Sequence, residues 1–250
     1  MKQVLIAVAL VLSALPQASA QQAVKLGHID RQKLMLALPE RKDAEGRMQA
    51  RFIGFKRRNT EILLVCSRDI LAPTLKRLSM FVMRAKAKLT DATDQFSLRG
   101  LAGNTINLIA AQAYPTGAKA DFGTSNMVFL HPADGVPRAL WVAPVGEPLP
   151  AGPALSTEVW QWGEVRSGIA TITTPIVEAF VPQMLNYESV GGVNFKKGCY
   201  PGQEVVARSQ FRGTLKRRAF LVRSESAMQA GQEVFAEGDD SQPAATVAQA

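Results

Sequence analysis

Residues 190–213 read VGGVNFKKGCYPGQEVVARSQFRG, a glycine-rich stretch that contains one of the two cysteines of the chain. Cys199 lies in this loop, with Lys196 and Lys197 just before it and a helix predicted over 205–210. A helix N-terminus and nearby ammonium groups both stabilise a thiolate, so the sequence predicts a lowered pKa and high reactivity for Cys199. Glycines let a backbone approach a ligand closely, and four fall within twelve positions: Gly191, Gly192, Gly198 and Gly202.

The second cysteine, Cys66, ends the apolar run EILLVC at 61–66, which predicts a buried strand. A thiol among aliphatic side chains is expected to be structural. The chain has only two cysteines and two histidines. These counts rule out a disulfide-rich scaffold and a four-cysteine zinc site, and they argue against a metal site built from histidines. We therefore expect no metal site.

The body of the chain alternates between strand and helix patterns, which predicts an α+β fold. Four prolines and two glycines between 144 and 153 indicate a linker. The predicted elements are strands at 61–66 and 96–101, a helix with Pro73 in its first turn that runs to about 84, a helix at 104–113, a hairpin of strands 128–131 and 139–142 around 132–135, and a helix from Thr174-Pro175 to about 185.

The composition indicates a globular protein with one or two domains. The chain has 250 residues, of which 47% are hydrophobic and 20% charged, with a net charge of +8 and a pI near 9.7. Such a charge favours anionic partners: nucleic acid, acidic lipid or a polyanionic small ligand. The basic run at 216–218 supports a nucleic-acid binder, but no RNA-binding signature with interleaved aromatic residues is present, so no direct nucleic-acid partner is expected.

The N-terminus has the features of an export signal. Residues 1–20 combine a positive start at Lys2, an apolar run over 4–15 and the small residues Ala18-Ser19-Ala20 of a cleavage site. A buried N-terminal helix is the alternative. An atypical lead segment follows at 21–45, and within it AVKLGHIDRQKLMLALPE at 23–40 resembles the start of the OmpH/Skp periplasmic chaperones. No other apolar stretch is long enough to cross a bilayer, so no stable membrane insertion is expected.

The segment KGCYPGQE at 197–204 resembles the signature K-G-C-Y-x-G-Q-E of the YgfZ folate-binding family, relatives of the glycine-cleavage T-protein. The likeness covers about 45–250 and includes RFIGF at 51–55 and the stretches 62–82, 164–180 and 181–218. The resemblance implies a T-protein/YgfZ-like folate-binding α+β domain over 46–216. It also implies that 217–250 forms the first strands of a C-terminal β-barrel. The family's α/β segment before Gly46-Arg47-Met48 is replaced here by the leader and the lead segment.

The resemblance also implies a function and a set of site residues. The family binds tetrahydrofolate as a cofactor and supports iron–sulfur cluster assembly or repair, which affects tRNA modification without classical turnover. Its partners are folate and iron–sulfur proteins or assembly factors. The resemblance assigns the essential thiol to Cys199, with Lys197, Tyr200, Gly202, Gln203 and Glu204 completing the signature. It places folate against Trp160, eight residues before Gly168. The anionic glutamate tail of folate is expected to meet Arg208 and Arg212, whereas 216–218 is either a tail contact or a solvated basic run.

Two alternatives to this function stay open. One is a folate-dependent aminomethyltransferase-like enzyme, which needs no reactive thiol at position 199. The other is a periplasmic chaperone of the OmpH/Skp type, supported only by residues 1–40. The resemblance implies a cytoplasmic protein, whereas the signal-like residues 1–20 argue for periplasmic export.

Overall fold

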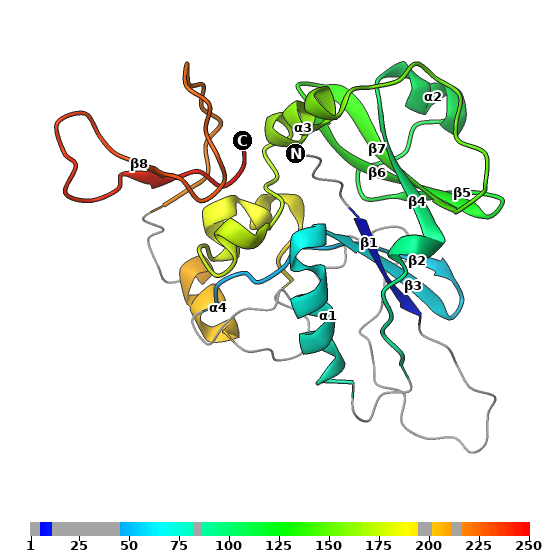
Figure 1. The fold of residues 1–250 in the computed structure, drawn as a ribbon, viewed down its shortest axis with the longest axis horizontal. Helices are drawn as coiled ribbons and strands as arrows, with labels where there is room; N and C mark the ends of the chain where they lie inside the picture. The colour runs from blue at the N-terminus through cyan, green and yellow to red at the C-terminus, as the bar shows by residue number, and fades with distance from the viewer. Residues whose placement is uncertain (1–5, 12–45, 83–86, 195–201, 212–216) are drawn as a thin grey trace. The chain divides into compact units, whose positions relative to one another are not determined.

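The computed structural model describes residues 6–11, 46–82, 87–194, 202–211 and 217–250 (Figure 1). The chain divides into two compact units: unit 1 comprises 1–38, 52–132 and 136–153, and unit 2 comprises 39–51, 133–135 and 154–250. The two units are defined by which residues lie close together in space. The domain boundaries that the family resemblance implies stay predictions. Helices alternate irregularly with antiparallel strands, which confirms the α+β class. Within the described ranges, no helix is both long and apolar enough to cross a bilayer.

Unit 1 is built on two β-sheets. The first has the strand order β1–β3–β2 and the second has the order β4–β7–β6–β5. The strands are β1 (Ile6–Val11), β2 (Ile53–Arg58), β3 (Glu61–Cys66), β4 (Phe96–Ala102), β5 (Lys119–Phe122), β6 (Ser125–Ala133) and β7 (Val136–Pro144). The helices that accompany them are α1 (Leu71–Ser79), α2 (Asn104–Ala110) and the short 3-10 turns η1 (Arg68–Ile70) and η2 (Thr93–Gln95).

The four-stranded sheet is buried on both faces. Because side chains alternate along a strand, Val128, Leu140 and Val142 face the first sheet, where Phe55, Leu63 and Val65 complete one core cluster. The intervening side chains of the same strands form a second cluster beneath α2, made of Ile106, Ala110, Ala118, Ala120, Met127, Phe129, Ala139, Trp141 and Ala143. Burial on both faces explains why β7 contains the uninterrupted apolar run ALWVA.

The β6–β7 hairpin confirms the prediction made from Pro132-Ala133-Asp134-Gly135. Asp134 and Gly135 both have positive φ, at 49° and 80°. This is the left-handed backbone that an Asp-Gly pair favours in a two-residue hairpin turn. The predicted strands at 61–66 and 96–101 are likewise confirmed as β3 and β4.

Part of the signal-like stretch forms a strand in the structure. The backbone of β1 pairs antiparallel with β3, from Ile6 opposite Cys66 to Val11 opposite Glu61 (Figure 1). The buried N-terminal helix considered as the alternative is therefore not what residues 6–11 form. Cleavage after Ala20 stays a prediction, and the lead segment 21–45 lies outside the described residues.

The helix predicted to begin at Thr174-Pro175 and end near 185 is wrong. Two short 3-10 turns, η3 (Thr174–Ile176) and η4 (Pro182–Leu185), stand there instead. Between them, the amide of Glu178 donates to the carbonyl oxygen of Met48 (2.7 Å), and the amide of Met48 donates to that of Phe180 (2.8 Å). Pro182 also has no amide hydrogen to continue a helix. Long-range pairing and a proline therefore override the local helical pattern.

Two further helices end earlier than predicted. α1 ends at Ser79 rather than near 84, because the amide of Phe81 bonds the carbonyl oxygen of Leu78 (3.0 Å) in a tightened last turn. α2 ends at Ala110 because Ala111 adopts a left-handed conformation, with φ of 55°.

Unit 2 consists mainly of short helices. Its elements, besides η3 and η4, are α3 (Thr157–Arg166), η5 (Tyr187–Val190), α4 (Gln203–Phe211), β8 (Glu233–Val234) and β9 (Ala245–Thr246). The strands β8 and β9 pair antiparallel. Residues 217–250 thus contain one two-stranded sheet, and a barrel stays a prediction.

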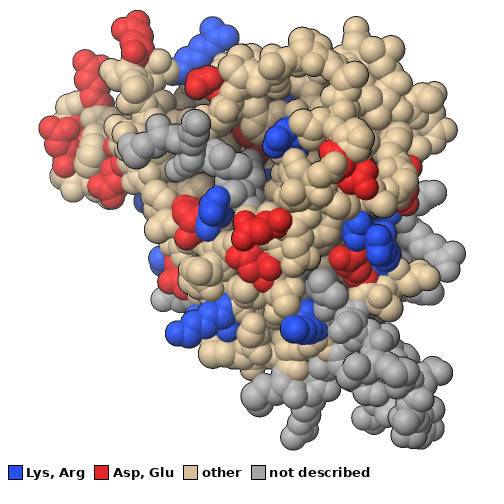
Figure 2. Space-filling view, turned by 45° about the vertical axis from the view of Figure 1, so that its right-hand side comes forward, with Lys and Arg blue, Asp and Glu red and all other residues tan. Residues whose placement is uncertain are grey.

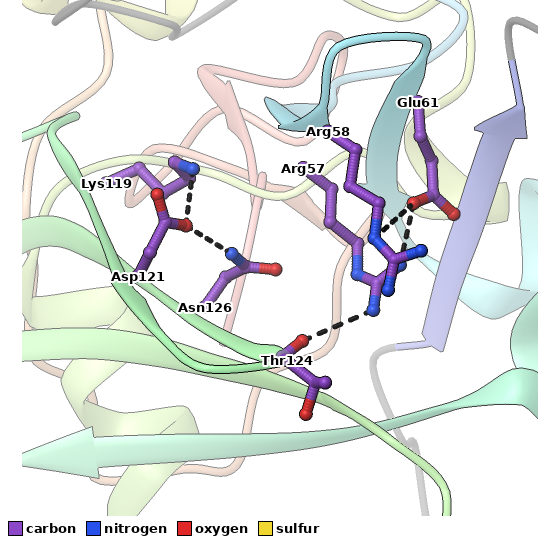
Figure 3. Close-up of polar contacts among 7 residues, drawn as sticks. All are labelled: Arg57, Arg58, Glu61, Lys119, Asp121, Thr124 and Asn126. Carbon is purple, nitrogen blue, oxygen red and sulfur yellow. Dashed lines mark hydrogen bonds and ion pairs between the residues drawn. The ribbon is translucent and has the colours of Figure 1, made fainter.

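A buried arginine ties the two sheets of unit 1 together (Figure 3). The side chain of Arg57 is 7% exposed, and its Nη1 lies 2.7 Å from Glu61 Oε2. Its Nη2 donates to the carbonyl oxygen of Thr124 (3.2 Å), between β5 and β6, and its guanidinium lies 5.0 Å from the centre of the Phe96 ring. One cation therefore joins the β2–β3 hairpin to the turn between β5 and β6.

Replacing Glu61 by glutamine is expected to lower the free energy of unfolding by about 2 to 3 kcal/mol. The change leaves the buried guanidinium of Arg57 without its counter-charge. Chemical denaturation followed by tryptophan fluorescence measures the effect. Arg58→Ala is the matched control, because the side chain of Arg58 is 64% exposed and its Nε lies 4.0 Å from Glu61 Oε2. It should change stability by less than about 1 kcal/mol. Equal losses for both variants would contradict the role given to Arg57.

Candidate functional site

Helix α4 begins directly after the cysteine signature. Gly202 has a φ of 74°, and the helix runs from Gln203 to Phe211. The helix predicted over 205–210 is confirmed, and it starts two residues earlier. Glu204 is exposed in its first turn, where a carboxylate interacts favourably with the helix dipole. The signature residues Lys197, Cys199 and Tyr200 lie outside the described residues, as does Arg212.

The start of α4 packs closely against Gly46, which is far upstream in the sequence. Gly46 has a φ of 77°, and a Cβ at this position would lie 3.1 Å from the carbonyl oxygen of Gly202 and 3.2 Å from Cβ of Val205. A larger residue at position 46 would thus be both strained and crowded. The fold therefore brings Gly46-Arg47-Met48, which the sequence pointed to by resemblance, onto the end of the signature.

The inner side of α4 is held by a buried amide. Gln183 has no exposed surface, and its Nε2 donates to the carbonyl oxygen of Val206 (2.9 Å). Val206 is fully buried on the inner side of the helix. Gln183 therefore fixes α4 to the η4 turn through a hydrogen bond shielded from water.

The chain after α4 is tied to the same region by Arg218. Its Nη1 donates to the carbonyl oxygen of Gln183 (3.1 Å), to Oδ1 of Asn186 (3.0 Å) and to the carboxylate of Glu188. Asn186 in turn donates from Nδ2 to the carbonyl oxygen of Ala219 (2.9 Å). Arg218 thus has a structural role. Residues 216–218 were expected to be either a contact for the folate tail or a solvated basic run, and Arg218 instead bonds to other parts of the chain.

Helix α3 presents its two nearby tryptophans to different surroundings. Ser156 caps it, accepting from the amide of Val159 (3.3 Å). Trp160 is half-buried, on the side of the helix where Gly163 and Glu164 are buried. Trp162 is 58% exposed on the other side, because residues two positions apart in a helix point in nearly opposite directions. Trp162 is not among the residues that the sequence predicted for the site.

An ion pair holds the side chain of Arg166 in place at the end of α3. Arg166 donates from Nε to Oδ2 of Asp134 (2.7 Å) and from Nη2 to Oδ1 (2.6 Å). Both residues belong to unit 2. The hydrogen bond from Arg166 lowers the pKa of Asp134, and the guanidinium of Arg166 also lies 5.6 Å from the centre of the Trp162 ring.

The expected folate contacts come from separate helices of unit 2. Trp160 is on α3, and Arg208 is exposed on α4, two residues beyond the buried Val206. Blue and red side chains are interspersed on the face that Figure 2 presents, with no single basic patch there. Among the residues whose positions are described, no group of three or more histidine, cysteine, aspartate or glutamate side chains could hold a metal ion.

Cys66 is buried in unit 1, as the sequence predicted. It is 2% exposed in β3, and its Sγ donates to the carbonyl oxygen of Ser67 (3.4 Å). Burial raises the pKa of this thiol to about 12, and the negative charges of Asp69 and Asp91 add to the effect. Cys66 is therefore a neutral thiol at physiological pH.

Comparison with known proteins identifies the chain's relatives. No protein-family model matches it. It is 29% identical over 194 residues to the tRNA-modifying protein YgfZ of Colwellia psychrerythraea, covering 73% of this chain and 58% of that one. It is 28% identical over 225 residues to the protein of the same name from Edwardsiella ictaluri (85% and 63%) and 30% identical over 188 residues to that from Klebsiella pneumoniae (70% and 56%).

These matches cover most of the chain but a smaller part of each relative. The chain spans about three fifths of the length of the curated relatives it matches. The matched proteins share one name, and the likeness extends far beyond the eight residues of the cysteine signature. The chain belongs to the YgfZ family.

Proposed function

We propose that the chain is a tetrahydrofolate-binding accessory protein for iron–sulfur cluster assembly or repair, acting indirectly on tRNA modification through Cys199. The observation that carries the proposal is the signature KGCYPGQE in a chain whose relatives are named tRNA-modifying proteins. Its role is accessory, because the working group is a thiol that exchanges or protects rather than one that turns over a substrate.

The physical basis for a working thiol is the start of α4. Cys199 precedes Gly202 by three residues, and α4 begins at Gln203. The first amides of a helix have no partners within it, and they favour nearby negative charge. Lys196 and Lys197 add positive charge just before the cysteine. These features favour a thiolate, and the bracing of α4 by Gly46 and Gln183 keeps the helix start in a fixed place.

The physical basis for folate binding is an aromatic ring and a cation. Trp160 is half-buried on α3, and an indole is the kind of ring on which a flat pterin or benzoyl ring stacks. Arg208 is exposed on α4 and carries the charge that a glutamate tail requires. Arg212, four residues later in the sequence, supplies a second cation.

Trp160→Ala is expected to weaken tetrahydrofolate binding by about 1 to 3 kcal/mol, because stacking on the indole is lost. Isothermal titration calorimetry with the full chain measures the affinity. Trp162→Ala is the matched control, because this ring lies on the opposite side of α3 and should leave folate affinity unchanged. Absence of tetrahydrofolate binding in the unmutated chain would refute the proposed function, whereas equal affinities of both variants would remove only Trp160 from the site.

Neutralising Arg208 and Arg212 with glutamine is expected to weaken polyglutamylated folate more than the monoglutamate. Each additional carboxylate adds an interaction that only the arginines supply. Parallel titrations with the two ligands measure the difference, and repeating them at higher salt should reduce it. Identical losses for both ligands would assign these arginines to structure instead.

Cys199 should react with iodoacetamide at a midpoint below the ordinary thiol pKa of about 8.5, and before Cys66. Cys66 provides the internal comparison, because its pKa is raised to about 12 by burial. Site-resolved mass spectrometry across a pH series measures both rates. Cys199→Ser should fail to restore a strain that lacks the family protein. If Cys66 labels as fast as Cys199 in the folded chain, the loop does not activate its cysteine.

A further inference from the structure

The outward side of α3 carries an exposed apolar ridge. Leu155, Val159 and Trp162 are 44%, 53% and 58% exposed. Val159 and Trp162, three residues apart, lie on one side of α3, away from Trp160 and the buried Glu164, and Leu155 lies just before the helix begins. Large apolar side chains that adjoin on a surface mark an interaction site more often than a chance exposure.

The charges around this ridge are symmetric about Trp162. Glu158 precedes it by four residues and Arg166 follows it by four. Each therefore lies about 6 Å from Trp162 along the helix axis, at 1.5 Å per residue, on the same side as the indole. If a second α3 is laid antiparallel across Trp162, Glu158 of each helix faces Arg166 of the other.

Both charged groups are held in place before any association. The pKa of Glu158 is lowered by hydrogen bonding to its own backbone amide at the helix start, and then by the Ser156 hydroxyl, so the carboxylate is ionised at neutral pH. Arg166 is fixed by its two hydrogen bonds to Asp134 and by its position over the Trp162 ring. A pre-oriented cation loses little side-chain freedom when a further carboxylate arrives.

We propose that the outward side of α3 is a self-association surface, on which a second copy of the chain docks its own α3 antiparallel with Trp162 at the two-fold axis. An isologous contact requires a self-complementary patch, and the arrangement of Glu158, Trp162 and Arg166 meets that requirement. Arg166 then lies between Asp134 of its own chain and Glu158 of the second copy. A tryptophan at the centre of a contact with an arginine beside it is the composition of an interface hot spot.

The first test is the concentration dependence of sedimentation velocity with the full chain. The unmutated chain should pass from monomer to dimer as its concentration rises. Trp162→Ala should raise the dissociation constant by about tenfold or more. Leu108→Ala is the matched control, because Leu108 is 83% exposed on α2 and should leave the dimer intact. A chain that stays monomeric throughout, as it would if this face served a different partner, overturns the proposal.

The second test uses charge reversal in two variants. In Glu158→Lys, the new lysine faces Arg166 of the second copy, and in Asp134→Asn/Arg166→Glu two glutamates face each other. Each variant alone should be monomeric. Mixed in equal amounts, they should form a heterodimer, because both cross-helix pairs then have opposite charges. Circular dichroism checks that each variant is folded, and Asp134→Asn alone controls for the lost ion pair. Folded variants that do not associate when mixed overturn the antiparallel arrangement, as does a dimer that neither variant changes.

Discussion

The carbonyl oxygen of Gly202 and the side chain of Val205 leave little room for a Cβ at position 46, and the candidate site depends on this close approach. Because Gly46 fits there, the adjoining Met48 can exchange backbone hydrogen bonds with Glu178 and Phe180. That segment leads to Gln183, whose amide reaches the carbonyl oxygen of Val206. Three distant parts of the chain are thereby fixed around the start of α4. A helix start held in this way keeps its first amides pointing in one direction, which favours negative charge nearby.

The sequence predicted the elements whose cause is local. The apolar run of β3, the Asp-Gly turn of the β6–β7 hairpin and the helix after Pro201-Gly202 all follow from short-range preferences, and all three are confirmed. The helix expected to end near 185 failed for the opposite reason. The amide of Glu178 and the carbonyl oxygen of Phe180 both bond to the backbone of Met48, and no local pattern contains that partner. The strand β1 was also missed, because an apolar run has no periodicity that separates a leader from a strand.

The residues of the candidate site show the same difference between local causes and long-range contacts. The prediction of Cys199 rests on the signature at 197–204 and that of Trp160 on its spacing to Gly168, and both stay predictions. Gln183 was not found, because a single glutamine between Pro182 and Met184 gives no sign that it is fully buried. The role of Arg218 was equally hidden, since a run of basic residues looks the same whether its members face water or bond to Asn186 and Glu188. Contacts between distant residues decide both cases, and the sequence by itself does not contain them.

The two cysteines are expected to differ in reactivity because of their surroundings rather than their residue type. Cys66 is enclosed by the core of unit 1, and the carboxylates of Asp69 and Asp91 make its thiolate still less favourable. Cys199 precedes a helix start and follows two lysines. A thiol of the first kind is protected from oxidants and electrophiles at any pH at which the fold is stable, whereas one of the second kind is available for exchange. One chain can therefore carry a working thiol without a second cysteine competing for the same chemistry.

The geometry of helix α3 separates the two surfaces proposed for folate and for a second copy of the chain. Trp160 and Trp162 are two residues apart, so about 200° of rotation separates them and one flat ligand cannot stack on both. Folate at Trp160 would approach the side on which Gly163 and Glu164 are buried, and a second chain at Trp162 would approach the opposite side. Both tryptophans belong to one continuous helix of ten residues. A change that tilts α3 at one surface therefore moves the other surface by the same rotation, and any coupling between folate and self-association would pass through the helix as a whole.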